Sequence, residues 1–159
     1  MGTHYSRLPL VAILLLTAVS SCVLAVGAAL LLQQLTTPIP IVGQFIELTL
    51  LRNRGIAFSI LLPSPWQGLL VIGALCMVCA IAFRTPLTKL LSVAFGLIIG
   101  GAIANLLDRL ITGAVTDYIA VGRFPVFNLA DVAIAVGACL LLLETWMKRE
   151  TGTRPLPPH

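Results

Sequence analysis

Residues 8–32 decide the fold: they read LPLVAILLLTAVSSCVLAVGAALLL and contain no charged side chain. About 20 consecutive apolar residues are enough for a helix to cross the hydrocarbon core of a bilayer. The run therefore predicts a membrane-spanning helix near the N-terminus, and the remaining chain has to be interpreted with a membrane as part of its solvent.

A cleaved signal peptide is the alternative interpretation of this run, because Val19-Ser20-Ser21-Cys22 resembles a lipoprotein cleavage box. The apolar core of a signal peptide spans only about 7–15 residues. Here the apolar run continues well past Cys22 to Leu32. We therefore expect the segment to be retained as a spanning helix.

The composition of the whole chain agrees with a membrane protein. The 159 residues are 58% hydrophobic and only 10% charged, and the mean hydropathy is +1.04. A soluble domain is about 25% charged. We predict an all-α membrane protein with four transmembrane helices, forming one domain over residues 1–147 with a disordered cytoplasmic tail at 148–159. The predicted spans lie at about 8–32, 66–83, 88–107 and 126–147, and residues 33–65 form an outer loop.

The basic residues set the predicted orientation, because cytoplasmic loops are enriched in Lys and Arg. The net charge is +4, but the basic residues are dispersed among apolar runs, so we expect no nucleic-acid partner. A cytoplasmic N-terminus places the larger group inside: Arg7, Arg84, Lys89, Lys148, Arg149 and Arg154. Arg52, Arg54, Arg109 and Arg123 then lie outside. Both termini are therefore predicted to be cytoplasmic.

The outer loop at 33–65 contains signals for non-helical structure. Gln44–Leu50 partly alternates polar and apolar residues, as a half-buried strand does, and Ala57–Leu62 is a candidate second strand. Four prolines bracket the region, which fits structure lying on the membrane surface. They are Pro38, Pro40, Pro63 and Pro65.

Asp131 lies inside the apolar run of the last span. Inserting an acidic residue there costs roughly 2.5–3.5 kcal/mol, which makes it a candidate functional residue. Asn128 precedes it by three positions and shares its helix face, as Asn105 and Arg109 share another. Asp108 and Arg109 are neighbours at a helix end, where we expect them to neutralise each other.

Asp117 is a second acid near the same predicted membrane boundary. Two close carboxylates share a proton, so that one donates to a carbonyl oxygen while the other takes a proton from water. This is the chemistry of aspartic proteases and needs no metal. The alternative is that Asn128 and Asp131 only hydrogen-bond neighbouring helices.

Other catalytic or metal sites are less well supported by the sequence. The only histidines, His4 and His159, lie at the termini, so a His triad or His-metal site is not expected. The C-x-x-C pair Cys76 and Cys79 is surrounded by apolar residues, and we interpret both as small membrane-helix residues.

Several linked motifs resemble the bacterial lipoprotein signal peptidases, signal peptidase II. The matching stretches are Asn53–Phe58, Gly101–Arg109, Val115–Tyr118 and Phe124–Asp131, and the resemblance covers the chain from Leu8 to Trp146. The resemblance implies an aspartic endopeptidase embedded in the bacterial inner membrane, among membrane lipids. The chemistry of two carboxylates needs no cofactor, and the short chain is compatible with a monomer. It would remove the signal peptide from diacylglyceryl-modified prolipoproteins, before the lipidated cysteine.

The resemblance also assigns roles to residues. Asp117 and Asp131 match the two catalytic aspartates of the family. Asn53, Asn105, Arg109 and Asn128 match supporting polar positions, and Asp108 matches an acid that looks structural. The family fold further implies a small extracytoplasmic β-cradle and a short surface helix, both expected from Gln33–Pro65.

The sequence departs from the family at the end of the first span. The family usually has Asp-x-x-x-Lys there, and this chain has Gln33 and Thr37; Ala104 also replaces a usual Gly. These departures motivate an alternative, a non-catalytic member that binds lipopeptides or a membrane partner. A proton-coupled transporter is a further alternative, but the acids cluster at one membrane face.

Overall fold

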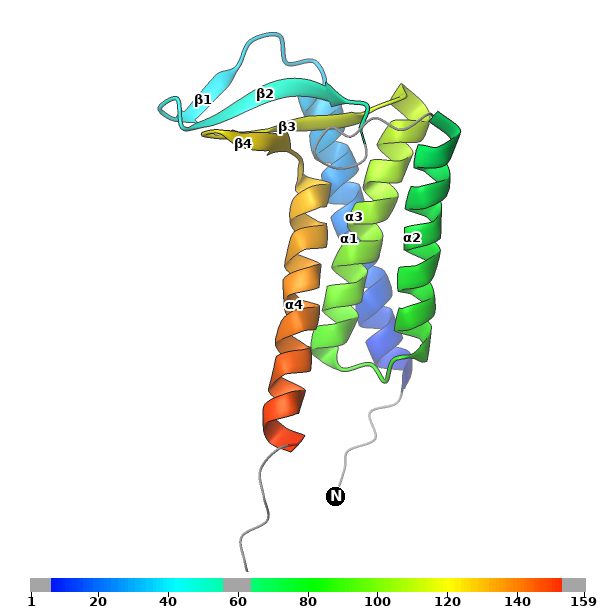
Figure 1. The fold of residues 1–159 in the computed structure, drawn as a ribbon. Coiled ribbons are helices and arrows are strands. Elements are labelled where there is room, and N and C mark those ends of the chain that lie inside the picture. The colour runs from blue at the N-terminus through cyan, green and yellow to red at the C-terminus, as the bar shows by residue number, and fades with distance from the viewer. Residues whose placement is uncertain (1–6, 56–63, 153–159) are drawn as a thin grey trace, which may run out of the picture.

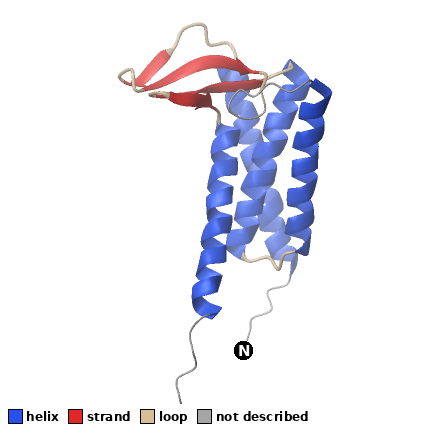
Figure 2. Ribbon diagram, in the orientation of Figure 1, coloured by secondary structure: helices blue, strands red, loops and turns tan. Residues whose placement is uncertain are grey.

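The computed structural model describes residues 7–55 and 64–152, which form four helices and a four-stranded sheet (Figures 1 and 2). The helices are α1 (Arg7–Leu32), α2 (Ser64–Arg84), α3 (Lys89–Thr112) and α4 (Leu129–Gly152). The strands are β1 (Ile39–Val42), β2 (Ile46–Asn53), β3 (Val115–Val121) and β4 (Phe124–Phe127). All four helices are long and apolar enough to cross a membrane, as the sequence predicted.

Helix α3 is the centre of the bundle, and glycines allow its neighbours to approach closely. A Cβ on Gly100 would lie 2.3 Å from the carbonyl oxygen of Ala18 in α1. A Cβ on Gly101 would lie 2.6 Å from the carbonyl oxygen of Ala130 in α4. Because apolar burial does not drive helices together in lipid, such small residues and the close packing they permit hold the bundle together.

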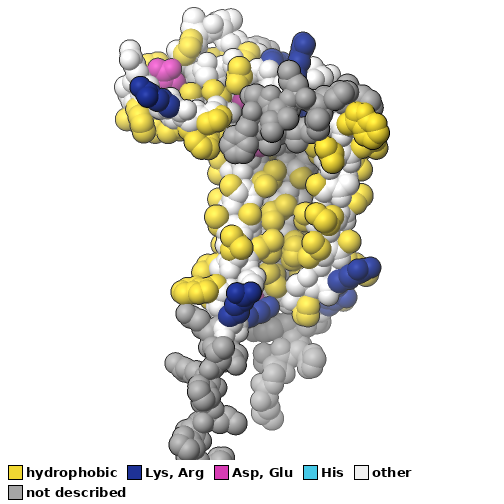
Figure 3. Space-filling model, in the orientation of Figure 1, with side chains coloured by type: hydrophobic (Ala, Val, Ile, Leu, Met, Phe, Trp, Pro, Cys, Tyr) yellow, Lys and Arg dark blue, Asp and Glu magenta, His cyan; other side chains and the backbone are white. Residues whose placement is uncertain are grey.

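Helix α2 is more peripheral than the other helices. Only 11% of its apolar window is buried inside the protein, against 44% for α3. It packs mainly on α3, and its outer surface is lined by large apolar side chains such as Leu69, Leu70 and Met77. The helical faces are apolar along the middle of the bundle and basic near the end opposite the sheet (Figure 3), as expected of side chains that meet lipid and then water.

The sheet lies across one end of the bundle and extends beyond α4 (Figure 1). Its strands are antiparallel in the order β1-β2-β3-β4. We expected Gln33–Pro65 alone to supply the sheet, but two of its four strands lie between α3 and α4. Residues 115–127 supply β3 and β4, because Val115–Val121 is rich in β-branched and apolar residues that pair along β2.

Two predicted boundaries differ from the structure around α4. The fourth span was expected from residue 126, but Phe124–Phe127 form β4 and the helix begins at Leu129. The expected disordered tail began at 148, but α4 continues to Gly152. A salt bridge of 3.3 Å between Lys148 and Glu144 joins successive helical turns and supports the extension; residues 153–159 lie outside the described chain.

Two other expectations fall partly outside the structure. The candidate strand Ala57–Leu62 lies in residues 56–63, which are not described. Residues 7–55 and 64–152 contain no short surface helix, so that element stays a prediction. The predicted strand at Gln44–Leu50 is confirmed with shifted bounds, since β2 covers Ile46–Asn53.

Candidate active site

Asp117 lies in β3 and is almost completely buried, with 1% of its surface exposed. Its two carboxylate oxygens accept hydrogen bonds from the side-chain amides of Asn53 and Asn128, both at 2.9 Å. Asn53 ends β2, and the register pairs Leu51 with Asp117. Because side chains two residues apart point to the same face of a strand, the antiparallel pairing brings Asn53 to the Asp117 side chain.

Asp131 lies in the first turn of α4, where Asn128 immediately precedes the helix. The backbone N–H of Asp131 donates to Asn128 Oδ1 at 3.0 Å, and the backbone N–H of Asn128 donates to Asp131 Oδ2 at 3.3 Å. This reciprocal pair is a capping box. We had expected Asn128 to lie on the face of the helix, but it is the N-cap of the helix instead.

Asn105 of α3 completes the connection between the two acids. Its side-chain N–H donates to Asp131 Oδ1 at 2.8 Å, and its oxygen accepts from Asn128 at 3.1 Å. The hydrogen-bonded series is therefore Asp131, Asn105, Asn128 and Asp117. The structure brings together the two acids and three of the four supporting residues predicted from the sequence, with the amides of Asn53, Asn105 and Asn128 as the donors.

Arg109 and Asp108 do not pair with each other as expected. Adjacent residues on a helix do not face each other, and each finds its own partner. Arg109 donates to the carbonyl oxygen of Gly55 at 2.8 Å, while Asp108 accepts from the backbone N–H of Thr116 at 2.6 Å. Asp108 thereby holds β3 against the end of α3, a structural role that the sequence also suggested.

The two acids line one end of a cavity of about 780 Å³ whose other walls are mostly apolar. Arg109, Asn105 and Asn53 line the same end. Within the described chain, Arg109 Nε is a buried donor without a hydrogen-bond partner. The apolar walls come from α2, α3, α4 and β4: Val71, Ala74, Leu75, Val78, Ile98, Ala102, Phe124, Val126, Phe127 and Ile134.

The environment of Asp117 favours its protonated form. Burial is the main cause and raises the pKa of Asp117 from 3.8 to about 6, although the hydrogen bond from Asn53 opposes this. The negative charge of Asp131 raises the pKa further, whereas the hydrogen bond from Asn128 lowers it. Because like charges close together resist joint ionisation, the pair is suited to holding one proton between them.

Tyr118 is a residue of the site that the sequence analysis did not single out. It is 3% exposed, and its hydroxyl accepts a hydrogen bond from the backbone N–H of Leu129 at 3.1 Å. This contact ties β3 to the first residue of α4, and therefore Asp117 to Asp131. The β-branched residues of Val115–Val121 were the available signal, but we assigned no element to the residues between the predicted spans 88–107 and 126–147.

The departures at Gln33 and Thr37 lie away from the dyad cavity. Gln33 follows α1 and lines a separate cavity of about 220 Å³, together with Asn105, Asp108 and Asn128. Thr37 is exposed in the connection to β1. Neither residue lines the cavity that contains Asp117 and Asp131, so the changed charges leave the composition of that cavity intact.

Comparisons with known proteins agree with this arrangement. A family model described as "Signal peptidase (SPase) II" matches residues 10–147. The lipoprotein signal peptidase of Halothermothrix orenii is 39% identical over 118 residues, covering 72% of this chain and 79% of that protein. The lipoprotein signal peptidase of Caulobacter vibrioides is 44% identical over 119 residues, covering 70% of each.

Solved structures share the fold. A structure described as a bacterial membrane enzyme superposes with a TM-score of 0.80 at 23% identity, covering 92% of this chain and 94% of that one. A second, similarly described, has a TM-score of 0.75 at 25% identity and covers 83% of this chain and 91% of its own. With the family match over most of its length, the chain belongs to the signal peptidase II family.

Proposed function

We propose that this protein is an aspartic endopeptidase that removes the signal peptide from diacylglyceryl-modified prolipoproteins, cutting before the lipidated cysteine. Membership of the signal peptidase II family supports a peptidase of prolipoproteins. The observation that carries the aspartic mechanism is the pair Asp117 and Asp131, joined through Asn128 and Asn105 at the polar end of an apolar cavity.

The dyad supplies acid–base catalysis to a water molecule. One aspartate takes a proton from water as the oxygen attacks the scissile carbonyl, and the other donates a proton to the carbonyl oxygen. Asp117 is better suited to carry the proton before attack, because burial raises its pKa. When the C–N bond breaks, the proton taken from water passes to the leaving nitrogen, and a hydroxyl of the tetrahedral intermediate returns its proton to the other aspartate. The dyad then again holds one proton, and the cycle closes without a cofactor.

The supporting residues position the acids and the substrate. Asn53, Asn105 and Asn128 hold three carboxylate oxygens through their side-chain N–H groups, so the rotamers of both acids are fixed. Arg109 provides a cation at the cavity, which suits it to stabilise the developing oxyanion. The apolar walls suit the substrate's lipid and the apolar part of its signal peptide.

We further propose that both termini are cytoplasmic and that the dyad lies near the extracytoplasmic face of the bacterial inner membrane. The end opposite the sheet carries Arg7, Arg84, Lys89, Lys148 and Arg149, and positive residues favour the cytoplasm. Arg109 lies at the sheet end, but it is held there by a hydrogen bond to Gly55 and is not a free positive residue of a loop. Residues 1–147 form the peptidase domain, which acts as a monomer among membrane lipids without a nucleic-acid partner.

The direct test uses purified protein in detergent or nanodiscs and a diacylglyceryl-modified prolipoprotein. We expect release of the signal peptide and a mature chain that begins at the lipidated cysteine, read by mass spectrometry. The same prolipoprotein without the lipid is the control and should be cut much more slowly. Absence of cleavage by the natural protein would instead support the non-catalytic alternative, which no feature of the dyad cavity favours.

A further inference from the structure

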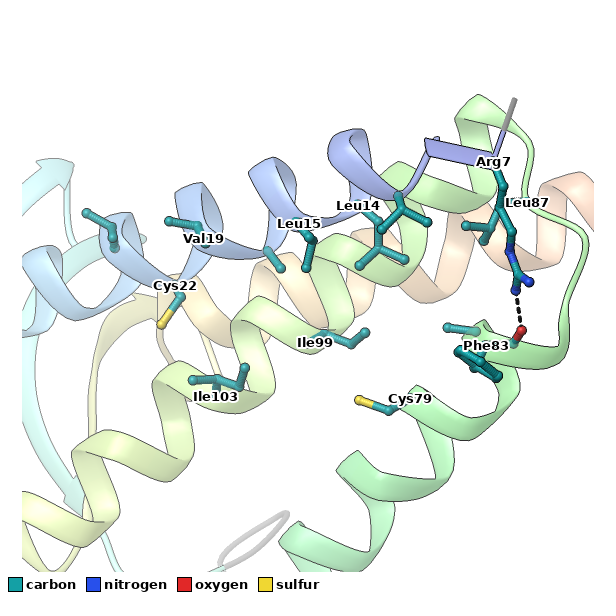
Figure 4. Close-up of a pocket in the computed structure, with 14 residues that line it drawn as sticks. Arg7, Leu14, Leu15, Val19, Cys22, Cys79, Phe83, Leu87, Ile99 and Ile103 are labelled. Atoms are coloured by element: carbon teal, nitrogen blue, oxygen red, sulfur yellow. Dashed lines mark hydrogen bonds between the residues drawn. The ribbon is translucent and has the colours of Figure 1, made fainter. Parts of the chain in front are cut away.

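A second cavity lies between α1 and α2, on a part of the bundle that the peptidase reaction does not use. Both helices pack on α3 rather than on each other, and α3 forms the floor between them (Figure 4). The cavity measures about 690 Å³ and shares no lining residue with the cavity that contains the dyad.

The wall of this groove on α1 is a continuous apolar ridge. Val11, Leu15, Val19 and Val23 recur every four residues and therefore share one face of the helix. All four are exposed, Val19 to 62%. The opposite wall is formed by Cys79 and by the largely exposed ring of Phe83 in α2. In a membrane such a groove is filled by hydrocarbon.

A cation marks the end of the groove that lies farthest from the sheet. Arg7 lines the groove, and its Nη2 donates a hydrogen bond to the carbonyl oxygen of Phe83 (Figure 4). Its guanidinium carbon lies 5.3 Å from the centre of the Phe83 ring. Among the described residues, no carboxylate forms an ion pair with Arg7. The charge is thus held at the mouth of an apolar groove and is not neutralised by any carboxylate that the structure describes.

We infer that this groove is a binding site for an anionic phospholipid of the cytoplasmic leaflet. The Arg7 guanidinium contacts the headgroup phosphate, and one acyl chain lies along Leu15 between α1 and α2. Basic pockets between transmembrane helices bind anionic headgroups in this way, and Arg retains further N–H donors for phosphate. The assignment to that leaflet rests on the proposed topology.

The dimensions of the groove fit an acyl chain. One leaflet contributes about 15 Å of hydrocarbon depth, and a helix rises 1.5 Å per residue. A tail that starts at Arg7 therefore reaches to about Ala18, beside the exposed ridge of α1. A substrate signal peptide is a poorer occupant, because its basic N-terminal segment would lie at the same membrane face as Arg7 and be repelled.

The experiment measures phospholipid retained by the full-length protein. The protein is reconstituted in nanodiscs of equal parts phosphatidylglycerol and phosphatidylcholine, released in the mass spectrometer, and its bound lipids are counted. We expect the wild type to retain one phosphatidylglycerol in preference to phosphatidylcholine. Arg7→Gln should lower retained phosphatidylglycerol about fivefold, the factor that corresponds to roughly 1 kcal/mol per basic residue near an anionic surface.

Two matched controls separate the groove from general effects. Leu15→Trp fills the groove and should abolish retention, whereas Leu16→Trp changes the adjacent lipid-facing residue outside the groove and should not. Arg149→Gln removes a charge at the same membrane face on α4 and should also leave retention unchanged. Equal retention by Arg7→Gln and wild type would overturn the inference. The inference would also be overturned if the protein formed a dimer that Leu15→Trp disrupts, since a second copy of the chain would then occupy the groove.

This test is independent of peptidase activity. If the groove does not bind lipid, no phosphatidylglycerol will be retained, but the protein will still cleave prolipoprotein, because none of the groove residues lines the dyad cavity. Failure of the proposed peptidase function would leave lipid retention as predicted.

Discussion

The two ends of the α3–α4 pair each bury an acid, but they support it in different ways. At the end opposite the sheet, Glu144 of α4 is 6% exposed, accepts a hydrogen bond from Thr88 Oγ1 at 3.0 Å and pairs with Lys148 at 3.3 Å. At the sheet end, Asp117 and Asp131 receive their side-chain hydrogen bonds from neutral asparagine amides.

This difference separates a structural acid from a reactive pair. Glu144 pairs with the cation of Lys148 and accepts a hydrogen bond from Thr88, so the acid serves to hold the start of α3 against α4. Neutral amides fix the position of Asp117 and Asp131 without cancelling their charge, and the two acids therefore oppose each other's ionisation. A buried acid in this bundle becomes suited to proton transfer only where its partners orient it but do not neutralise it.

The largest expected effect comes from removing one acid of the dyad at the sheet end. Asp117→Asn and Asp131→Asn should each lower kcat for prolipoprotein cleavage by about 10²–10⁴-fold, the usual contribution of general acid–base catalysis. Glu144→Gln is the matched control, since it neutralises a buried acid of the same bundle, and should retain activity within a few-fold. A comparable loss in Glu144→Gln would show that the two ends do not differ as proposed.

Removing an orienting amide should cost less than removing an acid. Asn128→Ala deletes the hydrogen bond to Asp117 and should lower kcat by about 10–100-fold, because a hydrogen bond to a charged group contributes about 1.5–3 kcal/mol. It also removes the N-cap of α4, which should lower the free energy of unfolding by about 1 kcal/mol. Asn128→Asp can still accept the capping hydrogen bond, but it places a second carboxylate against Asp117 and should lose activity as well.

Substitutions at glycines in the middle of the bundle test the close packing of the helices on α3. Gly100→Ala places a Cβ against the backbone of Ala18 and should lower the free energy of unfolding by about 1–3 kcal/mol. Gly73→Ala in α2 meets no atom within 4 Å and should be neutral or slightly stabilising. Thermal unfolding in detergent compares them; equal effects would argue against α3 as the packing centre.

The pH dependence of activity tests the shared proton. The active dyad needs one proton, so kcat/KM should fall as pH rises through the upper apparent pKa of the pair. The hydrogen bond from Asn53 lowers the pKa of Asp117. Asn53→Ala should therefore move this alkaline limb to higher pH, as measured in a pH–rate profile. A shift to lower pH would contradict the assignment of the proton to Asp117.

The smallest effect is expected at the structural end. Lys148→Gln removes a largely exposed partner of Glu144 and should lower the free energy of unfolding by about 0.3–0.5 kcal/mol, as for other exposed i,i+4 pairs. Peptidase activity should not change. A larger loss of activity than of stability would connect Glu144 to the reaction and weaken the contrast between the two ends.

Much of the membrane architecture was predictable because apolar length alone specifies a spanning helix. The four runs around 8–32, 66–83, 88–107 and 126–147 correspond to α1–α4. The sheet was harder to predict, because β2 pairs with β3 across the whole of α2 and α3. Nothing local in Val115–Val121 indicates that its partner lies more than sixty residues earlier, so the sequence alone did not predict this strand.

The candidate site divides in the same way. The sequence by itself determined the spans, the unusual acid Asp131, the candidate partner Asp117 and the surrounding amides, because polar residues in an apolar chain are few and costly. Only the tertiary structure decided the contacts: Asn53 with Asp117, Asn105 with Asp131, and Arg109 with Gly55 instead of Asp108. Those contacts depend on how close α3 and α4 approach and on the register of β2 with β3, which are set by packing between distant segments.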